Sequence, residues 1–526
     1  MKDYMIKNNN SIMQSSQLSV AELFHLQVKK TPKSTVIIDK NNKKYSYSEF
    51  LKRVLSLSSY LLSKGLRHGD RVAIISENCM EYLELEMAAA KIGIIVAAIN
   101  WRLSDNEMKY CINLVKPKIL FLSERYKNKG VVLSKKYIQS IILYNKNYEE
   151  IIKNTAIYNG PTLGSGEDIL LILYTSGTTG NPKGAMISHR AFISRAMYCV
   201  YEYNIDKDDV FPAWAPMFHM ASTDLAIGSV IIGGSIAFVD GFKSEQIIKL
   251  IKTYKLSWLV LMPGMIEELL GELKKKKLSI KGIKVMGAMA DLVPKKQIKE
   301  ITYLLKTPYL NSFGSTETGM PPASAGLIPI NKQRFGLSKI QSSFCQVKLE
   351  NEKGMVAKIG EVGECLIKGP TLFSGYWNAK ETNKHDFRGG WFHMGDLMKR
   401  NDNGTLDFVD RSKYLIKSGG ENIYPAEIER VLLGSKNVLE AVVVKIKSLK
   451  WGEVPLALVS VYNNISNEII KDDLFKLCRN KLAGYKQPKK ILFIDEKDIP
   501  RSTTGKVQRH LVEEIIFKKF NIKSLP

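Results

Sequence analysis

The sequence lacks a long hydrophobic run. Its longest nearly uninterrupted apolar stretch, from Leu225 to Val239, has 15 residues and includes three glycines. A membrane-spanning helix needs about 20 apolar residues, so we interpret this stretch as a buried helix followed by a strand. The first 16 residues are rich in Asn and Ser and contain no apolar core of a secretory signal. We therefore expect no membrane span and leave peripheral membrane contact open.

Disulfide and metal-binding patterns are also missing. The chain has six cysteines without CxxC spacing and seven histidines without an HExxH motif. Neither a disulfide framework nor a zinc site is expected from such spacing. Scattered cysteines are typical of a reducing compartment, so we predict a cytoplasmic protein.

Acidic residues are few relative to basic ones. The chain has 77 Lys and Arg against 52 Asp and Glu, a net charge of +25. A nucleic-acid-binding protein collects basic residues on one face, whereas these lysines are spread along the whole chain. A positive field that attracts polyanionic substrates, or a compositional bias toward lysine, explains the charge better. A basic nucleic-acid-binding protein is kept as the alternative of another class.

The order of predicted elements indicates an α/β protein with two domains. At 526 residues the chain is too long for one compact core. Helical and strand patterns alternate up to Asp410, which is typical of α/β layers; they include helices at 20–30, 48–63, 82–91, 244–254 and 264–274, and strands at 71–76, 118–122, 169–174, 235–239, 258–262 and 284–286. Residues 411–526 have the pattern of a small α+β domain, with helices at 425–433 and 471–483 and strands at 440–445, 456–461 and 490–494. We place the boundary at Asp410–Lys413, after a large domain of residues 1–410.

The most informative segment is a loop rich in glycine and hydroxyl groups, Tyr174–Gly184. An apolar strand leads into it, and a helical pattern with Ser188 as the candidate N-cap leads out. A strand, a glycine-rich loop and a helix in that order direct backbone N–H groups at an anion. The loop is not a Walker A motif, because Lys183 precedes a glycine instead of following one. A solvated turn is the alternative interpretation.

The string Y-T-S-G-T-T-G-x-P-K-G resembles the signature of adenylate-forming enzymes, which include acyl-CoA synthetases, luciferases and peptide-synthetase adenylation domains. Further motifs of that family follow in its order from about residue 20 to 510. The resemblance implies that the loop binds the triphosphate of ATP, with Thr175 also near Mg²⁺ and the reacting atoms. The loop residues concerned are Thr175, Ser176, Gly177, Thr178, Thr179, Gly180 and Lys183.

Asn311–Thr318 resembles the family motif [NQ]-x-[YF]-G-x-T-E. Phe313 offers a flat face to adenine, Thr316 a hydroxyl to the α-phosphate, and Glu317 a hard oxygen ligand to Mg²⁺. The alternative is a turn followed by a helix whose first turn contains Glu317. The predicted nucleotide-binding residues of this region are Gly287, Ala288, Asn311, Ser312, Phe313, Gly314, Ser315 and Thr316.

The C-terminal motifs resemble those of coenzyme A ligases, because the sequence G-G-E-N-I-Y-P is typical of these enzymes. The resemblance implies that Asp396 holds the ribose, Phe408 and Arg411 contact the nucleotide, Lys413 is the hinge, and Lys417, Ser418, Gly419 and Gly420 form the thioester-forming loop. Several residues depart from the family pattern: Met289, Lys339, Met394, Asp410 and Tyr414. The last two flank the hinge and leave its energetics open.

Two further residues match catalytic positions of the family. Lys506, in Pro500–Lys506, would neutralise charge between the carboxylate and the α-phosphate. His219 would flank the carboxylate and the thioester channel, although a lone histidine in an apolar stretch is more often structural. The predicted acyl pocket is mostly apolar and consists of His219, Met220, Thr223, Met286, Ala288, Gly314, Met320 and Pro321.

The resemblance implies an ATP-, Mg²⁺- and coenzyme A-dependent acyl-CoA synthetase with a large adenylating domain and a small mobile C-terminal domain. The pocket residues favour a medium- to long-chain aliphatic acid, with an aromatic or alicyclic acid as the alternative. An acyl-AMP ligase that loads a carrier protein is a further alternative. The oligomeric state is not predicted.

The role of Lys506 gives the first prediction. Lys506→Ala should abolish pyrophosphate release from acid and ATP, because the lysine serves only the first half-reaction. Thioester formation from a preformed acyl-adenylate and coenzyme A should be spared. Equal loss of both half-reactions, measured separately, would contradict this role.

Overall fold

The computed structural model describes residues 15–133, 137–175, 182–262, 264–275, 279–462, 467–501 and 507–525. The chain divides into two compact units. The first contains residues up to Gln346 together with 368–390, and the second contains 347–367 together with Trp391 onward. Residues 391–410 thus group with the C-terminal residues, earlier than the predicted boundary. That boundary at Asp410–Lys413 refers to a hinge and stays a prediction.

Two mostly parallel sheets form the frame of the first unit. The eight-stranded sheet has the order β16-β13-β12-β11-β9-β10-β1-β2 and the six-stranded sheet the order β6-β5-β3-β4-β7-β8. The first consists of β1 (Thr35–Ile38), β2 (Lys44–Ser46), β9 (Val210–Ala213), β10 (Ser235–Phe238), β11 (Leu256–Leu259), β12 (Ile283–Met286), β13 (Tyr309–Leu310) and β16 (Leu327–Ile328). The second consists of β3 (Arg71–Ile75), β4 (Ile95–Ala98), β5 (Ile119–Ser123), β6 (Ser140–Tyr144), β7 (Ile169–Thr175) and β8 (Lys183–Ser188). A two-stranded hairpin, β14 (Gly314–Ser315) and β15 (Gly319–Pro322), completes the strands of this unit.

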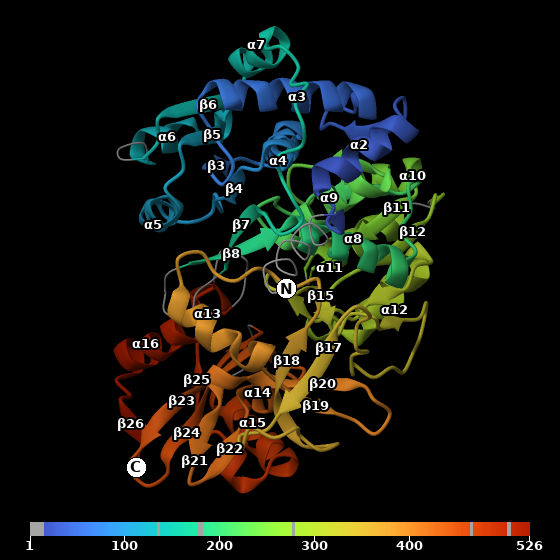
Figure 1. Ribbon diagram of the computed structural model, residues 1–526. Helices are drawn as coiled ribbons and strands as arrows, with labels where there is room; N and C mark the ends of the chain where they lie inside the picture. Colours follow the sequence, from blue (N-terminus) through green and yellow to red (C-terminus); the bar gives the residue numbers. More distant parts are fainter. Residues whose placement is uncertain are drawn as a thin grey trace, which may run out of the picture. The chain divides into compact units, whose positions relative to one another are not determined.

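Helices precede, connect and follow these strands, and parallel pairing requires crossover connections of this kind. They are α2 (Val20–Lys30), α3 (Tyr47–Ser63), α4 (Met80–Ile92), α5 (Asp105–Val115), α6 (Lys127–Leu133), α7 (Lys146–Asn154), α8 (His189–Tyr203), α9 (Met220–Ile232), α10 (Ser244–Thr253), α11 (Met265–Lys275), α12 (Lys295–Leu305) and α13 (Lys380–Asp386). Helix α3 packs against both α4 and α7 (Figure 1). Capping boxes begin α2, α3 and α5, each a serine paired with a glutamate three residues later.

Two antiparallel or mixed sheets form the second unit. A four-stranded sheet has the order β17-β18-β19-β20, and a six-stranded sheet has the order β22-β21-β24-β23-β26 with β25 beside β24. The strands are β17 (Gln346–Glu350), β18 (Val362–Lys368), β19 (Phe392–Arg400), β20 (Leu406–Arg411), β21 (Ile416–Ser418), β22 (Glu421–Ile423), β23 (Val438–Ser448), β24 (Gly452–Val461), β25 (Lys490–Phe493) and β26 (Ser524–Leu525). The helices are α14 (Pro425–Leu432), α15 (Asn467–Lys481) and α16 (Arg509–Phe520).

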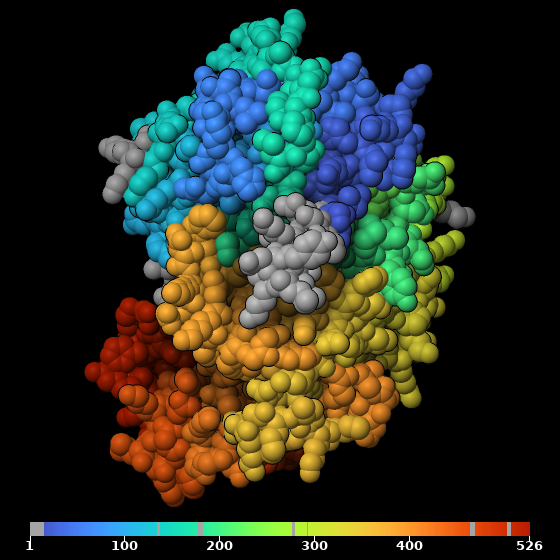
Figure 2. All heavy atoms as spheres, viewed as in Figure 1, coloured from blue at the N-terminus to red at the C-terminus, as the bar shows by residue number. Residues whose placement is uncertain are grey.

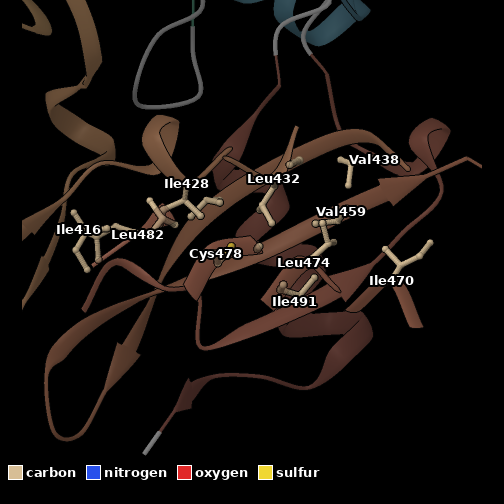
Figure 3. Packing of buried hydrophobic residues seen from close by; sticks show 14 residues of the cluster. Ile416, Ile428, Leu432, Val438, Val459, Ile470, Leu474, Cys478, Leu482 and Ile491 are labelled. Carbon is tan, nitrogen blue, oxygen red and sulfur yellow. The ribbon is translucent and has the colours of Figure 1, made fainter. Parts of the chain in front are cut away.

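The strands β23 and β24 carry a core on each face, because successive side chains of a strand point to opposite sides. On one face Val443 and Val459 pack with residues of α14 and α15, such as Leu432 and Leu474 (Figure 3). On the other face the intervening residues of the same strands pack with α16. The unit therefore holds two apolar layers around one sheet.

The predicted α/β fold with a smaller α+β C-terminal part is confirmed. The predicted helix at 20–30 has the observed bounds, and most other predicted elements differ from the observed ones by one to four residues at their ends. None of the described helices combines the length and apolar character needed to cross a bilayer. No disulfide joins any of the six cysteines, all of which lie within the described residues.

The core of the second unit gives a prediction about two adjacent leucines. Leu432 is fully buried in the cluster, whereas Leu433 is 48% exposed. Leu432→Ala should lower the free energy of unfolding by about 2–5 kcal/mol, since it removes buried methyl groups and leaves a cavity. Leu433→Ala should change it by no more than about 0.5 kcal/mol. Calorimetric unfolding of both variants tests this, and equal effects would contradict the placement of Leu432.

Candidate functional site

The predicted phosphate loop joins two antiparallel strands. Strand β7 ends at Thr175, and β8 begins at Lys183, its direct cross-strand partner. The predicted order of strand, loop and helix is therefore wrong in one respect: β8 intervenes before α8, so the helix N-terminus does not follow the loop directly. Ser188 does cap α8, accepting a hydrogen bond from the Ala191 N–H. Ser176, Gly177, Thr178, Thr179 and Gly180 lie outside the described residues, as does Lys506.

The segment that contains the predicted adenine-binding residues is held from two sides. Asn311 is buried; its amide donates to the carbonyls of Leu337 and Ser338, and its Oδ1 accepts from Lys339 Nζ at 2.7 Å. Ser312 Oγ accepts from the Met289 N–H at 3.0 Å. The structure thus brings the 287–289 segment together with the 311–313 segment.

Gly287 shows why this site requires glycine. Its φ is +84°, and an added Cβ would collide with the ring of Tyr309. Tyr309 in turn donates to the Ala288 carbonyl at 3.1 Å, and Trp258 Nε1 donates to the Gly287 carbonyl at 2.8 Å. The tight turn is therefore fixed by two aromatic side chains of the eight-stranded sheet.

Glu317 lies in the turn between β14 and β15, so the alternative that placed it in a helix is wrong. Its Oε1 accepts a hydrogen bond from the Tyr376 hydroxyl at 2.8 Å. Lys183 Nζ lies 4.9 Å from the centre of the same Tyr376 ring. Tyr376 therefore connects the predicted metal ligand with the predicted phosphate-binding lysine. The carboxylate of Glu317 is only half-buried, so it remains accessible to a ligand.

His219 is the N-cap of α9, and its Nδ1 accepts the Ala221 N–H at 3.2 Å. A neutral imidazole that accepts at Nδ1 carries its proton on Nε2. His219 is therefore set up to donate a hydrogen bond from Nε2. This tautomer disfavours a role of His219 as a general base.

The predicted acyl-pocket residues occupy different environments. Met286 and Thr223 are fully buried, and the Thr223 hydroxyl donates to Glu86 at 2.8 Å. Burial raises the pKa of Glu86 well above its usual value. The others range from buried to exposed: Met220, Ala288, Met320 and Pro321 are buried, His219 is half-buried and Gly314 is exposed.

The second unit contains the predicted ribose-binding residues. Asp396 and Arg411 are direct partners across β19 and β20, and Arg411 Nε lies 2.8 Å from Asp396 Oδ1. Asp396 is almost fully buried, whereas the Arg411 side chain is 42% exposed. Phe408, three residues before Arg411 on β20, is half-buried.

The predicted hinge residue, Lys413, lies between two residues that depart from the family pattern. Asp410 is buried; it accepts from the Arg411 N–H and from the Ala426 N–H at the start of α14, both at 2.7 Å. Burial raises its pKa, and these hydrogen bonds oppose the rise. Tyr414 lies under two cations, with Arg509 at 4.6 Å and Lys413 at 4.7 Å from its ring centre. Asp410 and Tyr414 therefore both have partners within the second unit.

The predicted thioester-forming loop is the turn of the β21–β22 hairpin. Ser418 pairs with Glu421, which leaves Gly419 and Gly420 as the two central residues. Both have positive φ, +57° and +90°, as a type I′ turn requires. An added Cβ on Gly419 would lie 2.7 Å from the ring of Trp451.

Sequence reasoning missed several residues that hold this site. Tyr376 and Arg195 stand in no motif, and Lys339 was noted only as a departure from the family pattern. Lys339 is 1% exposed and bridges Asn311 and Asp291. No local pattern identifies such residues, because these partners lie 28 to 176 positions away in the chain.

Two family descriptions match the chain. "AMP-binding enzyme" matches residues 24–377, and "AMP-binding enzyme C-terminal domain" matches residues 427–506. The chain belongs to the AMP-binding enzyme family. The resemblance to adenylate-forming enzymes is thereby confirmed over most of the sequence.

Similar proteins include several CoA ligases. Indoleacetate–CoA ligase of Aromatoleum aromaticum is 28% identical over 485 residues, covering 90% of this chain and 94% of that protein. A 2-succinylbenzoate–CoA ligase of Bacillus cereus is 29% identical over 490 residues, covering 92% and 96%. The o-succinylbenzoate CoA synthetase structure from Bacillus subtilis, in complex with its acyl-adenylate intermediate, has a TM-score of 0.81 at 25% identity and covers 95% and 98%. The chain is an acid–CoA ligase that uses ATP, Mg²⁺ and coenzyme A.

The Tyr376 contact gives a prediction. If Glu317 serves Mg²⁺, Tyr376→Phe should lower pyrophosphate release about tenfold at limiting Mg²⁺, since a hydrogen bond to a charged group contributes about 1.5 kcal/mol. Excess Mg²⁺ should recover part of the rate. Tyr303→Phe, at a position 61% exposed on α12, is the control. An unchanged Mg²⁺ dependence of Tyr376→Phe would contradict the contact's role.

Proposed function

We propose that the acid is a ring-bearing aromatic monocarboxylic acid. The observation that carries this proposal is the similarity to the indoleacetate and 2-succinylbenzoate CoA ligases over at least 90% of the chain. It reverses the order predicted from the pocket residues alone, in which an aliphatic acid came first. Apolar side chains accept both kinds of acid, so they do not discriminate between them.

Aromatic side chains next to His219 support the proposal. Trp101 packs edge-to-face on Phe218 at 5.9 Å and stacks on Tyr126 at 5.7 Å. Phe218 directly precedes His219, the residue assigned to the carboxylate. A ring in the substrate would add to such a cluster, because edge-to-face ring pairs gain about 0.5–1.5 kcal/mol beyond burial.

A single carboxylate fits the predicted pocket better than two. The predicted lining contains no arginine or lysine. Arg102 lies over the Trp101 and Phe218 rings, 4.8 and 6.0 Å from their centres; a second buried carboxylate that does not reach this cation would carry a large desolvation cost. On this ground the proposed acid resembles indoleacetate more than 2-succinylbenzoate.

The proposed reaction has two half-reactions. The carboxylate oxygen attacks the α-phosphorus of ATP, and pyrophosphate leaves; Thr175, Lys183 and the loop between them hold the phosphates. The coenzyme A thiolate then attacks the acyl carbonyl. The bond between the acyl carbon and the bridging oxygen breaks, and AMP leaves with that oxygen. Positioning and charge neutralisation supply most of the rate in such transfers.

Glu317 and Thr175 have the oxygen donors that Mg²⁺ prefers, and the metal would neutralise charge on the triphosphate. Tyr376 orients the Glu317 carboxylate for this task. In the second unit, Asp396 and Arg411 would hold the ribose, and a hinge at Lys413 would bring either Lys506 or the Lys417–Gly420 loop to the reacting atoms. In this proposal the two moving domains are residues 1–410 and 411–526, although residues 391–410 group with the C-terminal residues by their contacts.

Two subsidiary assignments complete the proposal. Coenzyme A is preferred over a carrier protein as acceptor, since the relatives that match over 94% and 96% of their own lengths are CoA ligases. Cytoplasmic location is proposed from the scattered cysteines.

An acid panel tests the substrate. Indoleacetate, phenylacetate and phenylpropionate should give kcat/KM values at least about tenfold above those of octanoate and palmitate. Pyrophosphate release and thioester mass are measured in parallel, with acid-free reactions as the control. Preference for an aliphatic acid would overturn the aromatic assignment, and AMP without thioester would contradict the coenzyme A step.

A further inference from the structure

Arg195 is a buried arginine of the first unit. It lies on α8, is 2% exposed, and uses all of its guanidinium nitrogens. Nε donates to the Thr371 carbonyl at 3.0 Å, and one terminal nitrogen donates to the Thr316 carbonyl at 3.0 Å. The other terminal nitrogen donates to both carboxylate oxygens of Asp224, at 3.1 and 3.3 Å. One side chain thus connects three segments that are far apart in the sequence.

The Thr316 and Thr371 carbonyls belong to the two segments that the hydrogen bond between Phe373 and Glu317 joins. Thr316 directly precedes Glu317. Thr371 lies two residues before Phe373, whose N–H donates to the Glu317 carbonyl at 2.8 Å. Arg195 therefore fixes both the turn that carries Glu317 and the segment that leads to Tyr376.

The surrounding backbone is shaped to admit this guanidinium. Gly319 has φ of +74°, and an added Cβ would lie 2.8 Å from Arg195 Nε. A buried charge costs several kcal/mol unless it is paired and fully hydrogen-bonded. Asp224 supplies the pair; burial raises the pKa of its carboxyl, and Arg195 opposes that rise. The planar guanidinium is essential here, because a lysine ammonium cannot donate hydrogen bonds to acceptors in three directions within one plane.

We propose that Arg195, with Asp224 as its counter-ion, is a positioning residue for the first half-reaction: it holds the Thr316–Glu317 turn in the geometry that binds the metal and the α-phosphate. Asp224 belongs to α9, whose N-cap is His219. The pair therefore also ties the helix at the carboxylate to the turn at the phosphate. This inference rests on the proposed role of Glu317.

Arg190 provides a matched control on the same helix. It donates to the carbonyls of Pro370 and Leu372, on either side of Thr371, and pairs with Glu167. The described contacts of Arg190 include none to the Thr316–Glu317 turn. A substitution at Arg190 therefore perturbs the packing of α8 on the 370–372 segment without touching the turn.

The test compares Arg195→Lys, Asp224→Asn, Arg190→Lys and Glu317→Gln in the full-length protein. Acid-dependent ATP–pyrophosphate exchange is measured as a function of free Mg²⁺, and thioester formation is measured from a preformed acyl-adenylate. Arg195→Lys should lower the exchange kcat about 10- to 100-fold and raise the half-saturating Mg²⁺ at least about threefold. Its thioester step should stay within about twofold of the parent, and Arg190→Lys should stay within about twofold in both steps. Asp224→Asn should shift Mg²⁺ dependence in the same direction by a smaller factor.

The outcomes separate this inference from the proposed function. If Glu317→Gln shifts the Mg²⁺ dependence and Arg195→Lys behaves like Arg190→Lys, the inference is overturned and the role of Glu317 stands. If Glu317→Gln leaves the Mg²⁺ dependence unchanged, the role of Glu317 fails and the inference fails with it. If Arg195→Lys does not fold, Asp224→Asn decides, and an unchanged Mg²⁺ dependence there overturns the proposal.

Discussion

The first unit depends on the backbone pairing of residues 373–377 with two other segments. The Phe373 N–H donates to the Glu317 carbonyl, while Ser374 and Trp377 donate to carbonyls of β8, and the Met186 N–H of β8 donates back to Gly375. Figure 2 shows the region around this segment and α13, in light orange, beside blue and cyan residues of the same unit. Because the segment bonds to both the strand of Lys183 and the turn of Glu317, it sets the spacing between the two. Tyr376 then occupies the position between their side chains.

This constraint explains why charges are placed as they are. Lys183 and Glu317 are both only half-buried and reach the same tyrosine from different segments, whereas the Arg195–Asp224 pair behind the turn is buried. The two half-buried side chains reach solvent, and Arg195 of the buried pair donates to the Thr316 carbonyl, next to Glu317. A preorganised arrangement of this kind avoids reorganisation during the reaction. The family membership identifies the reaction, and the relatives direct the choice of acid toward aromatic compounds.

The second unit shows how two residues that depart from the family pattern are accommodated near the predicted hinge residue, Lys413. Asp410 departs from the family pattern, yet its carboxylate accepts two backbone N–H groups, one of them at the start of α14. Tyr414 also departs from this pattern, and its ring lies under Arg509, which is itself paired with Glu429. These contacts anchor both sides of Lys413 to helices of the same unit.

The sequence by itself determined the family and the cofactors, because the family motifs are continuous stretches of residues. It also determined the positions of most helices and strands, because caps, alternating patterns and glycine turns are local. Ser188 and the Gly419–Gly420 turn were predictable in this way. The sequence could not predict β8 after the phosphate loop, since Lys183–Ser188 forms a strand only by pairing with β7. Nor could it predict Tyr376, Arg195 or Lys339, whose partners are brought to them by the packing of distant segments. Only the tertiary structure decided which side chains hold Glu317 and Asn311, because a hydrogen bond depends on proximity in space and the motif spacing carries no information about it.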